Sequence, residues 1–393
     1  MKRSALLLLF ISLGVVGCAG TPGPQYSSAT RSLLRLSLDE QLQVYRRIEE
    51  VYPTRVVKRG AKVRELPVAS TQLQPRITWR GTTYEDVNAF MQVARFSGLL
   101  VIHDGEIVLE RYAFDRKPED RWTSFSVAKS VTAILLGAAI QDGYIQSLDE
   151  PVTKYVPQLA GSGYDGVNIR QLITMTSGVK WNEDYADPNS DVARASSWPG
   201  EPGMNPLVSY MRRLPSEAKP GTKFVYKTGE TDMAGLLVAN AVGKGLAEYL
   251  SEKIWQPYGM ERDAIWMVDR GGAERGGCCM SVTLRDYGRL GLFMLEGGKA
   301  GEKQVIPEWY LQEATTNQIK PPAEGSYGYF WWIHDDGYAA YGIFGQQIRI
   351  SPQEKLIVVL NGAFPTADDD DLSQAEEAVW QGVREALKTQ HGS

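Results

Sequence analysis

Alternating runs of apolar residues indicate an antiparallel sheet that is assembled from two distant parts of the chain. Near the beginning, residues 98–102 and 107–112 are rich in branched and aromatic side chains and flank an Asp-Gly pair at 104–105. Because Asp-Gly readily adopts the positive φ that a two-residue turn requires, these runs predict a β-hairpin. Near the end, turn residues separate four more strand-like runs, which cover 327–334, 338–344, 347–351 and 356–361.

Helical periodicity predicts the elements around this sheet. Apolar residues at helical spacing predict one surface helix over 31–50 and a closing helix over 372–387. Residues 126–315 show mostly helical patterns broken by Pro and Gly loops. The pattern favours an α+β protein, in which an antiparallel sheet flanked by terminal helices (31–125 and 316–393) hosts a mostly helical inserted domain (126–315).

The first 30 residues are expected to lie outside this fold. Lys2 and Arg3 precede an apolar run over 5–16, which is typical of a secretory signal and shorter than the ~20 residues that span a bilayer. The run ends at Gly17-Cys18 in a pattern that resembles a bacterial lipobox. We therefore expect a signal peptide over 1–17, a lipidated Cys18 with a flexible linker over 18–30, and a protein anchored by lipid in the bacterial periplasm, at the outer membrane.

Composition narrows the classes of function. Among 393 residues, 42 Lys and Arg stand against 47 Asp and Glu, and this net charge of -5 with no basic stripe argues against a nucleic-acid partner. The 3 histidines, His103, His334 and His391, are too few for a multi-histidine zinc site, and we expect neither a metal nor an organic cofactor. For the adjacent Cys278 and Cys279 we expect two free thiols, since a bond between neighbours is strained.

Ser126 and Lys129 form the strongest chemical motif. Residues 126–143 have the clearest helical pattern, and a spacing of three places both side chains on one helix face. A serine at a helix start can stabilise an oxyanion with its own free N–H and the helix dipole. A lysine one turn into an apolar helix loses hydration, which lowers its pKa and lets it accept the serine proton. A second Ser-x-x-Lys, Ser216 to Lys219, precedes Pro-Gly in a loop and is taken as incidental.

Several further motifs follow in a fixed order. Phe-Ser-Val-Ala-Lys-Ser stands at 125–130, Met-Thr-Ser-Gly at 175–178, and Pro-Gly-Thr-Lys-Phe-Val-Tyr at 220–226. This order resembles the serine beta-lactamase and penicillin-binding-protein superfamily, particularly its class C-like esterase and 6-aminohexanoate-dimer hydrolase branch. The resemblance implies a beta-lactamase/transpeptidase-like fold.

The resemblance also implies a catalytic role for Tyr226 beside Ser126 and Lys129. Lys227 and Thr228, which follow Tyr226, depart from the small residues that are usual in the family. Whether Lys129 or Tyr226 is the general base stays open at this point. Such a site needs no histidine, which agrees with the absence of a Gly-x-Ser-x-Gly motif from the sequence.

Tyr-Gly-Ile-Phe-Gly-Gln-Gln at 341–347 occupies the place of the family's third motif but has no basic residue. If Gly342 is the motif glycine, the Ile343 N–H is the second oxyanion donor. If Gly345 is the motif glycine, the donor is Gln346. The amide-hydrolase branch has a similar Gly-Ile-x-Gly-Gln run, which favours Ile343.

The resemblance further implies that Tyr185, Trp331 and Gln346 contact the substrate. The sequence thus predicts a serine hydrolase that acts on small ester or linear amide substrates through an acyl-enzyme. Without a basic residue in 341–347 the enzyme lacks the usual partner of a beta-lactam carboxylate. A beta-lactamase or D-Ala-D-Ala carboxypeptidase stays an alternative, as does a catalytically silent lipoprotein that binds the cell wall.

Overall fold

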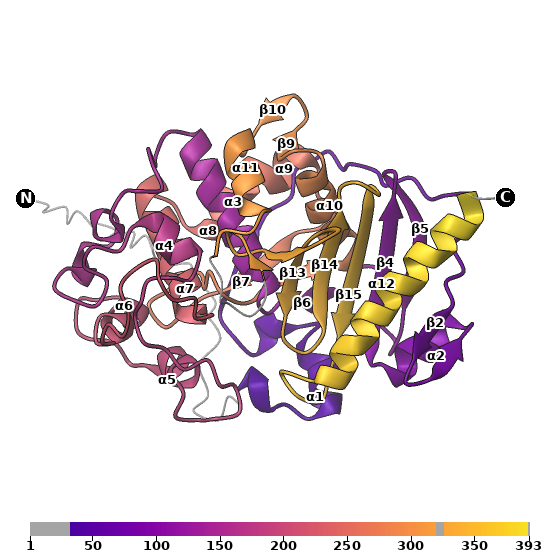
Figure 1. Ribbon diagram of the computed structural model, residues 1–393, viewed down its shortest axis with the longest axis horizontal. Helices are drawn as coiled ribbons and strands as arrows, with labels where there is room; N and C mark the ends of the chain where they lie inside the picture. The colour runs from indigo at the N-terminus through magenta and orange to yellow at the C-terminus, as the bar shows by residue number, and fades with distance from the viewer. Residues whose placement is uncertain (1–31, 320–325, 392–393) are drawn as a thin grey trace, which may run out of the picture.

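The computed structural model describes residues 32–319 and 326–391. The predicted signal peptide, Cys18 and the linker over 18–30 lie outside these residues. Within the two described ranges, no helix is both long enough and apolar enough to cross a membrane. Figure 1 shows the arrangement of the helices and strands.

Seven strands form the central sheet, in the order β11-β12-β13-β14-β15-β4-β5 with antiparallel neighbours throughout. Their bounds are β4 (Phe96–His103), β5 (Glu106–Tyr112), β11 (Ser326–Tyr327), β12 (Trp332–His334), β13 (Gly337–Gly342), β14 (Gln346–Ser351) and β15 (Leu356–Gly362). The pairing of β15 with β4, which sets Val358 opposite Val101, joins the two distant parts of the chain. The predicted α+β fold is confirmed.

Successive residues of β4 face opposite sides of this sheet, as the two-residue period of a strand requires. Leu99 and Val101 pack in one core with the closing helix α12 (Asp370–His391), which crosses the sheet in Figure 1. Leu100 and Ile102 belong to the core of the other face, which includes α10 (Leu284–Leu295). The central sheet is therefore a rigid layer that is buried on both faces.

A second sheet of four strands has the order β1-β7-β8-β6, and two short hairpins complete the strands. The bounds are β1 (Thr54–Val57), β6 (Arg121–Thr123), β7 (Ala264–Met267), β8 (Met280–Thr283), β2 (Ile77–Trp79), β3 (Thr82–Tyr84), β9 (Lys299–Ala300) and β10 (Lys303–Gln304). The remaining helices are α2 (Val87–Val93), α3 (Val127–Gln141), η3 (Val152–Lys154), η4 (Pro157–Leu159), α4 (Ile169–Ile173), α5 (Asp191–Ser197), α6 (Pro206–Met211), α7 (Thr228–Val242), α8 (Leu246–Leu250), η5 (Ser251–Trp255), α9 (Gln256–Tyr258) and α11 (Glu308–Ala314).

Helix α3 lies at the centre of the molecule. It packs against α7 and α8 and also against β13 and β14. Residues 127–139 are all buried, which explains why the helix is apolar on every side rather than along one stripe. Its N-terminal end therefore meets both the sheet and the helical region.

Two predicted elements are wrong in their extent. Residues 31–50 do not form one helix: the described part contains η1 (Leu33–Arg35), α1 (Leu38–Val44) and η2 (Ile48–Glu50). Ser37 starts a new helix here, because its hydroxyl and the Glu40 carboxylate cap each other's backbone N–H groups. The strand expected over 327–334 is interrupted by a turn, in which the Gly328 N–H donates to Trp331 O.

Candidate active site

Ser126 lies directly before α3 with its side chain largely buried, at 8% exposure. The preceding residue, Phe125, has a φ of 42°, an unfavourable value for a residue with a side chain. Its ring is held between Tyr45 and Phe344, with ring centroids 5.1 Å apart in both pairs. Aromatic packing therefore fixes the sharp backbone turn that presents Ser126 at the helix start.

Lys129 is 1% exposed and lies one helical turn after Ser126. Its Nζ is 3.1 Å from Ser126 Oγ, 2.9 Å from Thr228 Oγ1 and 3.0 Å from the Gly277 carbonyl oxygen. Burial lowers the pKa of Lys129 to about 8, although the negative charge of Glu183 acts in the opposite direction. Burial of the Lys129 side chain therefore favours its neutral amine over the ammonium.

Tyr226 lies beside both residues. Lys129 Nζ is 5.1 Å from the centre of its ring, which stacks on Trp332 at a centroid distance of 5.7 Å. Burial raises the pKa of Tyr226 well above its usual value, and a hydrogen bond with Ser126 acts against this rise. The structure thus brings Ser126, Lys129 and Tyr226 together with a phenol that keeps its proton.

The end of β13 lies against the backbone of Ser126. A Cβ on Gly342 would lie 3.0 Å from Ser126 N and 2.5 Å from Ser124 O, so only glycine fits there. In the described ranges, neither the Ser126 N–H nor the Ile343 N–H donates to a backbone oxygen. The structure therefore places Gly342, rather than Gly345, against the Ser126 backbone.

Two polar residues that the sequence did not single out complete the surroundings. Thr228 accepts a hydrogen bond from Lys129 Nζ, while its own hydroxyl donates to Glu183 Oε1 and its backbone N–H donates to Glu183 Oε2 over 2.9 Å. The Tyr185 hydroxyl and the Trp181 indole N–H also donate to this carboxylate. Glu183 thus turns the Thr228 oxygen toward Lys129. The position of Thr228 in the second motif could have indicated it, whereas no pattern marked Glu183.

Comparison with protein families places the chain in a known family. A family model described as Beta-lactamase matches residues 85–379, which contain every residue of the constellation. The chain belongs to the beta-lactamase family. The predicted membership of the serine beta-lactamase and penicillin-binding-protein superfamily is confirmed. The family match does not test the predicted lipid anchor.

The similar proteins include hydrolases of several kinds. The 6-aminohexanoate-dimer hydrolase of Paenarthrobacter ureafaciens is 29% identical over 360 residues, which are 87% of this chain and 90% of that protein. A lovastatin esterase of Penicillium rubens is 25% identical over 44% of this chain and 46% of its own length. A solved structure, a putative 6-aminohexanoate-dimer hydrolase from Bacillus anthracis, has a TM-score of 0.82 at 22% identity and covers 94% of this chain and 99% of its own. The chain is therefore a serine hydrolase of the amidase or esterase type.

Two residues predicted to contact substrate lie elsewhere in this beta-lactamase-family enzyme. Trp331 is 2% exposed and packs edge-on against Tyr338 in the core. Gln346 is fully buried, and its amide donates to Phe344 O and Gly362 O over 2.9 Å each. Both predictions were wrong: Trp331 packs in the core, and the Gln346 side chain stabilises the turn after β13 through its hydrogen bonds.

Tyr185, in contrast, lines the same cavity as Ser126. Its hydroxyl donates to Glu183 over 2.7 Å, so the residue also supports the carboxylate that orients Thr228. Cys278 lines this cavity too, and it forms a disulfide with Cys279 rather than the expected pair of free thiols. The two cysteines are adjacent in the loop directly before β8.

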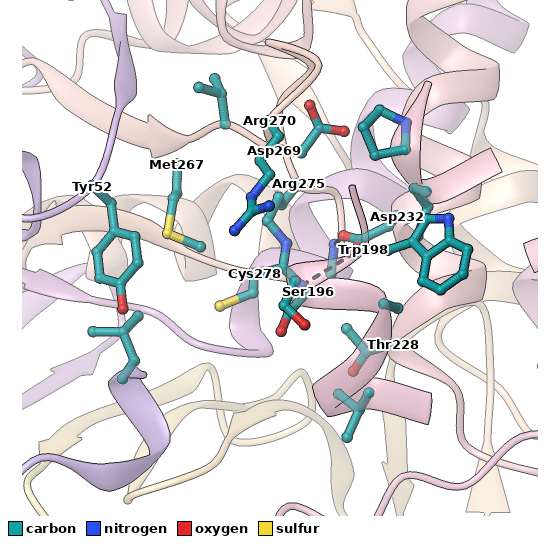
Figure 2. A pocket seen from close by; sticks show the side chains of 18 of the residues that line it. Tyr52, Ser196, Trp198, Thr228, Asp232, Met267, Asp269, Arg270, Arg275 and Cys278 are labelled. Atoms are coloured by element: carbon teal, nitrogen blue, oxygen red, sulfur yellow. Dashed lines mark hydrogen bonds and ion pairs between the residues drawn. The ribbon is translucent and has the colours of Figure 1, made fainter. Parts of the chain in front are cut away.

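The cavity has a volume of about 610 Å³, which is typical of small-molecule sites. Beside Ser126 its lining is largely apolar and includes Leu33, Leu34, Val192, Leu236, Met267 and Ile343. Figure 2 shows part of the lining, with Thr228 on one side and Asp269 and Arg270 on the other.

Proposed function

We propose that this enzyme hydrolyses small esters and linear amides through an acyl-enzyme on Ser126. The hydrogen bonds of Lys129 carry the proposal. The Gly277 carbonyl can only accept, and the Thr228 hydroxyl already donates to Glu183, so both must accept from Lys129. A neutral Lys129 amine has two N–H groups, which these two oxygens take. Its lone pair then faces Ser126 Oγ, 3.1 Å away.

The reaction follows from this arrangement. The Ser126 oxygen attacks the substrate carbonyl while its proton passes to Lys129, and the backbone N–H groups of Ser126 and Ile343 hold the oxyanion. When the tetrahedral intermediate collapses, Tyr226 gives its proton to the leaving alkoxide or amine, and the proton on Lys129 restores the phenol. Water then attacks the carbonyl of the acyl-enzyme and gives its proton to the general base. The same two N–H groups hold the oxyanion, and Ser126 regains its proton as the carboxylic acid leaves. In this scheme Lys129 is the general base, because the raised pKa of Tyr226 keeps its phenol protonated.

The substrate class is inferred from the lining and from the names of the relatives. The 6-aminohexanoate-dimer hydrolase and the lovastatin esterase act, by name, on a linear amide and an ester. Residues 341–347 lack the basic side chain that would pair with the carboxylate of a beta-lactam. Esters with small or apolar acyl groups therefore rank above beta-lactams and D-Ala-D-Ala peptides.

Active-site labelling tests the nucleophile. A fluorophosphonate probe should label the wild type and Ser216→Ala, but not Ser126→Ala. Label on Ser216 would overturn the assignment. Ser216 serves as the matched control because it belongs to the second Ser-x-x-Lys in a loop.

A substrate panel tests the reaction class. It contains p-nitrophenyl butyrate, a linear amide, a chromogenic cephalosporin and a D-Ala-D-Ala peptide. We expect the ester to have the highest kcat/KM. A higher value for the cephalosporin would favour a beta-lactamase, and a higher value for the peptide would favour a carboxypeptidase. Turnover of none, without labelling, would favour a silent cell-wall-binding protein.

For the location of the enzyme, we propose a lipid on Cys18 that anchors it in the periplasm, at the outer membrane. The support is the sequence alone: a charged start, a short apolar run and a lipobox-like end before a flexible linker. In a bacterial host, Cys18→Ala should move the protein from the membrane fraction to the soluble fraction. Recovery of this variant in the membrane fraction would contradict the anchor.

A further inference from the structure

The five charged residues that line the active-site cavity differ in the hydrogen-bond and ion-pair partners of their side chains. They are Asp232, Asp269, Arg270, Glu274 and Arg275. All belong to α7 or to the loop between β7 and β8. The partners of each charge therefore decide which charge is available to a ligand in the cavity.

The three carboxylates are occupied. Asp232 accepts from the Gly277 N–H over 2.7 Å and faces Arg275 at 3.4 Å. Asp269 accepts from the Asn205 side-chain amide and from the Ala273 N–H, each over 2.9 Å. Asp232 is therefore balanced by the Arg275 cation, whereas the donors to Asp269 are neutral and its negative charge remains.

Glu274 is occupied as well, by the Arg55 guanidinium at 3.0 Å and by the Ala247 N–H at 3.1 Å. Arg275 is paired with Asp232 and is 19% exposed. Arg270 is the remaining cation, and within 32–319 and 326–391 it has no hydrogen bond or ion pair. Its guanidinium is exposed and belongs to the wall of the cavity.

The position of Arg270 relative to the reactive residues indicates which part of a substrate it can contact. Thr228 contacts Lys129, and Figure 2 shows Thr228 and Arg270 on opposite sides of the pocket. Apolar residues line the cavity in which both stand. A linear substrate that presents its carbonyl to Ser126 can therefore extend an apolar stem and place an anionic end at Arg270.

We propose that Arg270 forms a carboxylate subsite that selects linear substrates with a negatively charged end remote from the scissile bond. A guanidinium binds a carboxylate through two parallel N–H···O bonds, which lysine or a neutral side chain cannot reproduce. The subsite lies on the loop between β7 and β8, whereas the motif that lacks a basic residue lies at the end of β13. The inference rests on the proposed ester and amide hydrolysis at Ser126.

Matched esters test the subsite and locate the carboxylate. In one arm, p-nitrophenyl monoesters of succinic, adipic and suberic acids are compared with the same esters capped by a methyl group. In the other arm, the butyrate ester of 4-hydroxybenzoate is compared with that of 4-hydroxybenzamide. We expect the free carboxylate to raise kcat/KM about tenfold in one of the arms, mainly through KM.

Variants connect this preference to Arg270. Arg270→Gln should bring the ratio of charged to capped substrate close to one, and Arg270→Lys should keep part of it. Arg76→Gln, a change to an exposed arginine paired with Glu85, should keep the full ratio. No preference in either arm, or a preference that survives Arg270→Gln, would overturn the subsite.

A binding measurement separates this inference from the proposed reaction. Calorimetry with the inactive Ser126→Ala variant compares adipate with its monomethyl ester, and then repeats both titrations with Arg270→Gln added. Tighter binding of adipate that depends on Arg270 would support the subsite even if no ester were hydrolysed. Equal binding would refute the subsite and leave the proposed hydrolysis intact.

Discussion

Two buried lysines stand at the starts of two neighbouring helices, and their surroundings give them opposite roles. Lys129 in α3 is 1% exposed and, among the residues that the structure describes, has only neutral oxygens within hydrogen-bond distance, those of Ser126, Thr228 and Gly277. Lys227, directly before α7, is fully buried and lies 3.4 Å from the Glu230 carboxylate. The same side chain at the same depth thus faces neutral oxygens in one place, where we propose that it accepts a proton, and forms half of an ion pair in the other.

The difference follows from the cost of burying a charge. A charge without a counter-charge loses hydration and gains little, so burial lowers the pKa of Lys129 to about 8. Beside Lys227, burial raises the pKa of Glu230, while the charge of Lys227 and a hydrogen bond from Ser177 act against this rise. Burial alone therefore does not make a lysine reactive: the charge of its nearest partner decides.

The largest expected effect is the loss of activity on removing Lys129. Lys129→Ala should lower kcat/KM for p-nitrophenyl butyrate by at least about 10³-fold, because Lys129 accepts the Ser126 proton in the proposed reaction. Steady-state kinetics on folded protein measures this effect. Lys219→Ala, in the incidental motif, is the control and should have wild-type activity. Activity of Lys129→Ala close to that of the wild type would contradict the proposed role of Lys129.

Removing the other lysine should affect stability instead. Lys227→Met leaves Glu230 buried without its cation and should lower the free energy of unfolding by about 3 kcal/mol, with little change in activity per folded molecule. Urea unfolding measures the loss. The double variant Lys227→Met/Glu230→Leu should regain most of it, since no charge is then buried. Unchanged stability in the single variant would show that the ion pair is not structural.

The pH dependence of the rate sharpens the role of Lys129. Below its pKa of about 8 the ammonium holds a proton and cannot accept another. The value of kcat/KM should therefore rise about tenfold per pH unit up to this pKa and level off above it. A profile measured with p-nitrophenyl butyrate from pH 6 to 9.5 tests this. A rate independent of pH across that range would exclude Lys129 as the base.

The smallest expected effect concerns Glu183. Its negative charge raises the pKa of Lys129, so Glu183→Gln should lower this pKa and move the rising limb of the profile to lower pH. Glutamine keeps an oxygen for Thr228, so a modest loss of the plateau rate is expected. Glu217→Gln, which removes a carboxylate that faces Lys223, is the control. A limb that moves to higher pH would contradict the proposed charge effect.

Local patterns were sufficient for most of the fold. The hairpin of β4 and β5 was expected from its Asp-Gly turn, and Asp104 and Gly105 indeed have φ values of 48° and 85°. The N-terminal helices were missed because Ser37 caps a helix inside an otherwise continuous apolar pattern. The turn after Tyr327 was missed because aromatic residues favour strands, whereas here they fill the core.

The sequence by itself determined the α+β pattern, the helix that places Ser126 and Lys129 on one face, and the motif that contains Tyr226. The first two features depend on the spacing of residues close in the chain, whereas Tyr226 was found through the resemblance of its motif to a known family. Tertiary structure alone decided which glycine lies against Ser126, that Trp331 and Gln346 are buried, and that Glu183 orients Thr228 toward Lys129. These contacts join residues tens to hundreds of positions apart, and charge balance among such residues depends on distances that no local pattern contains.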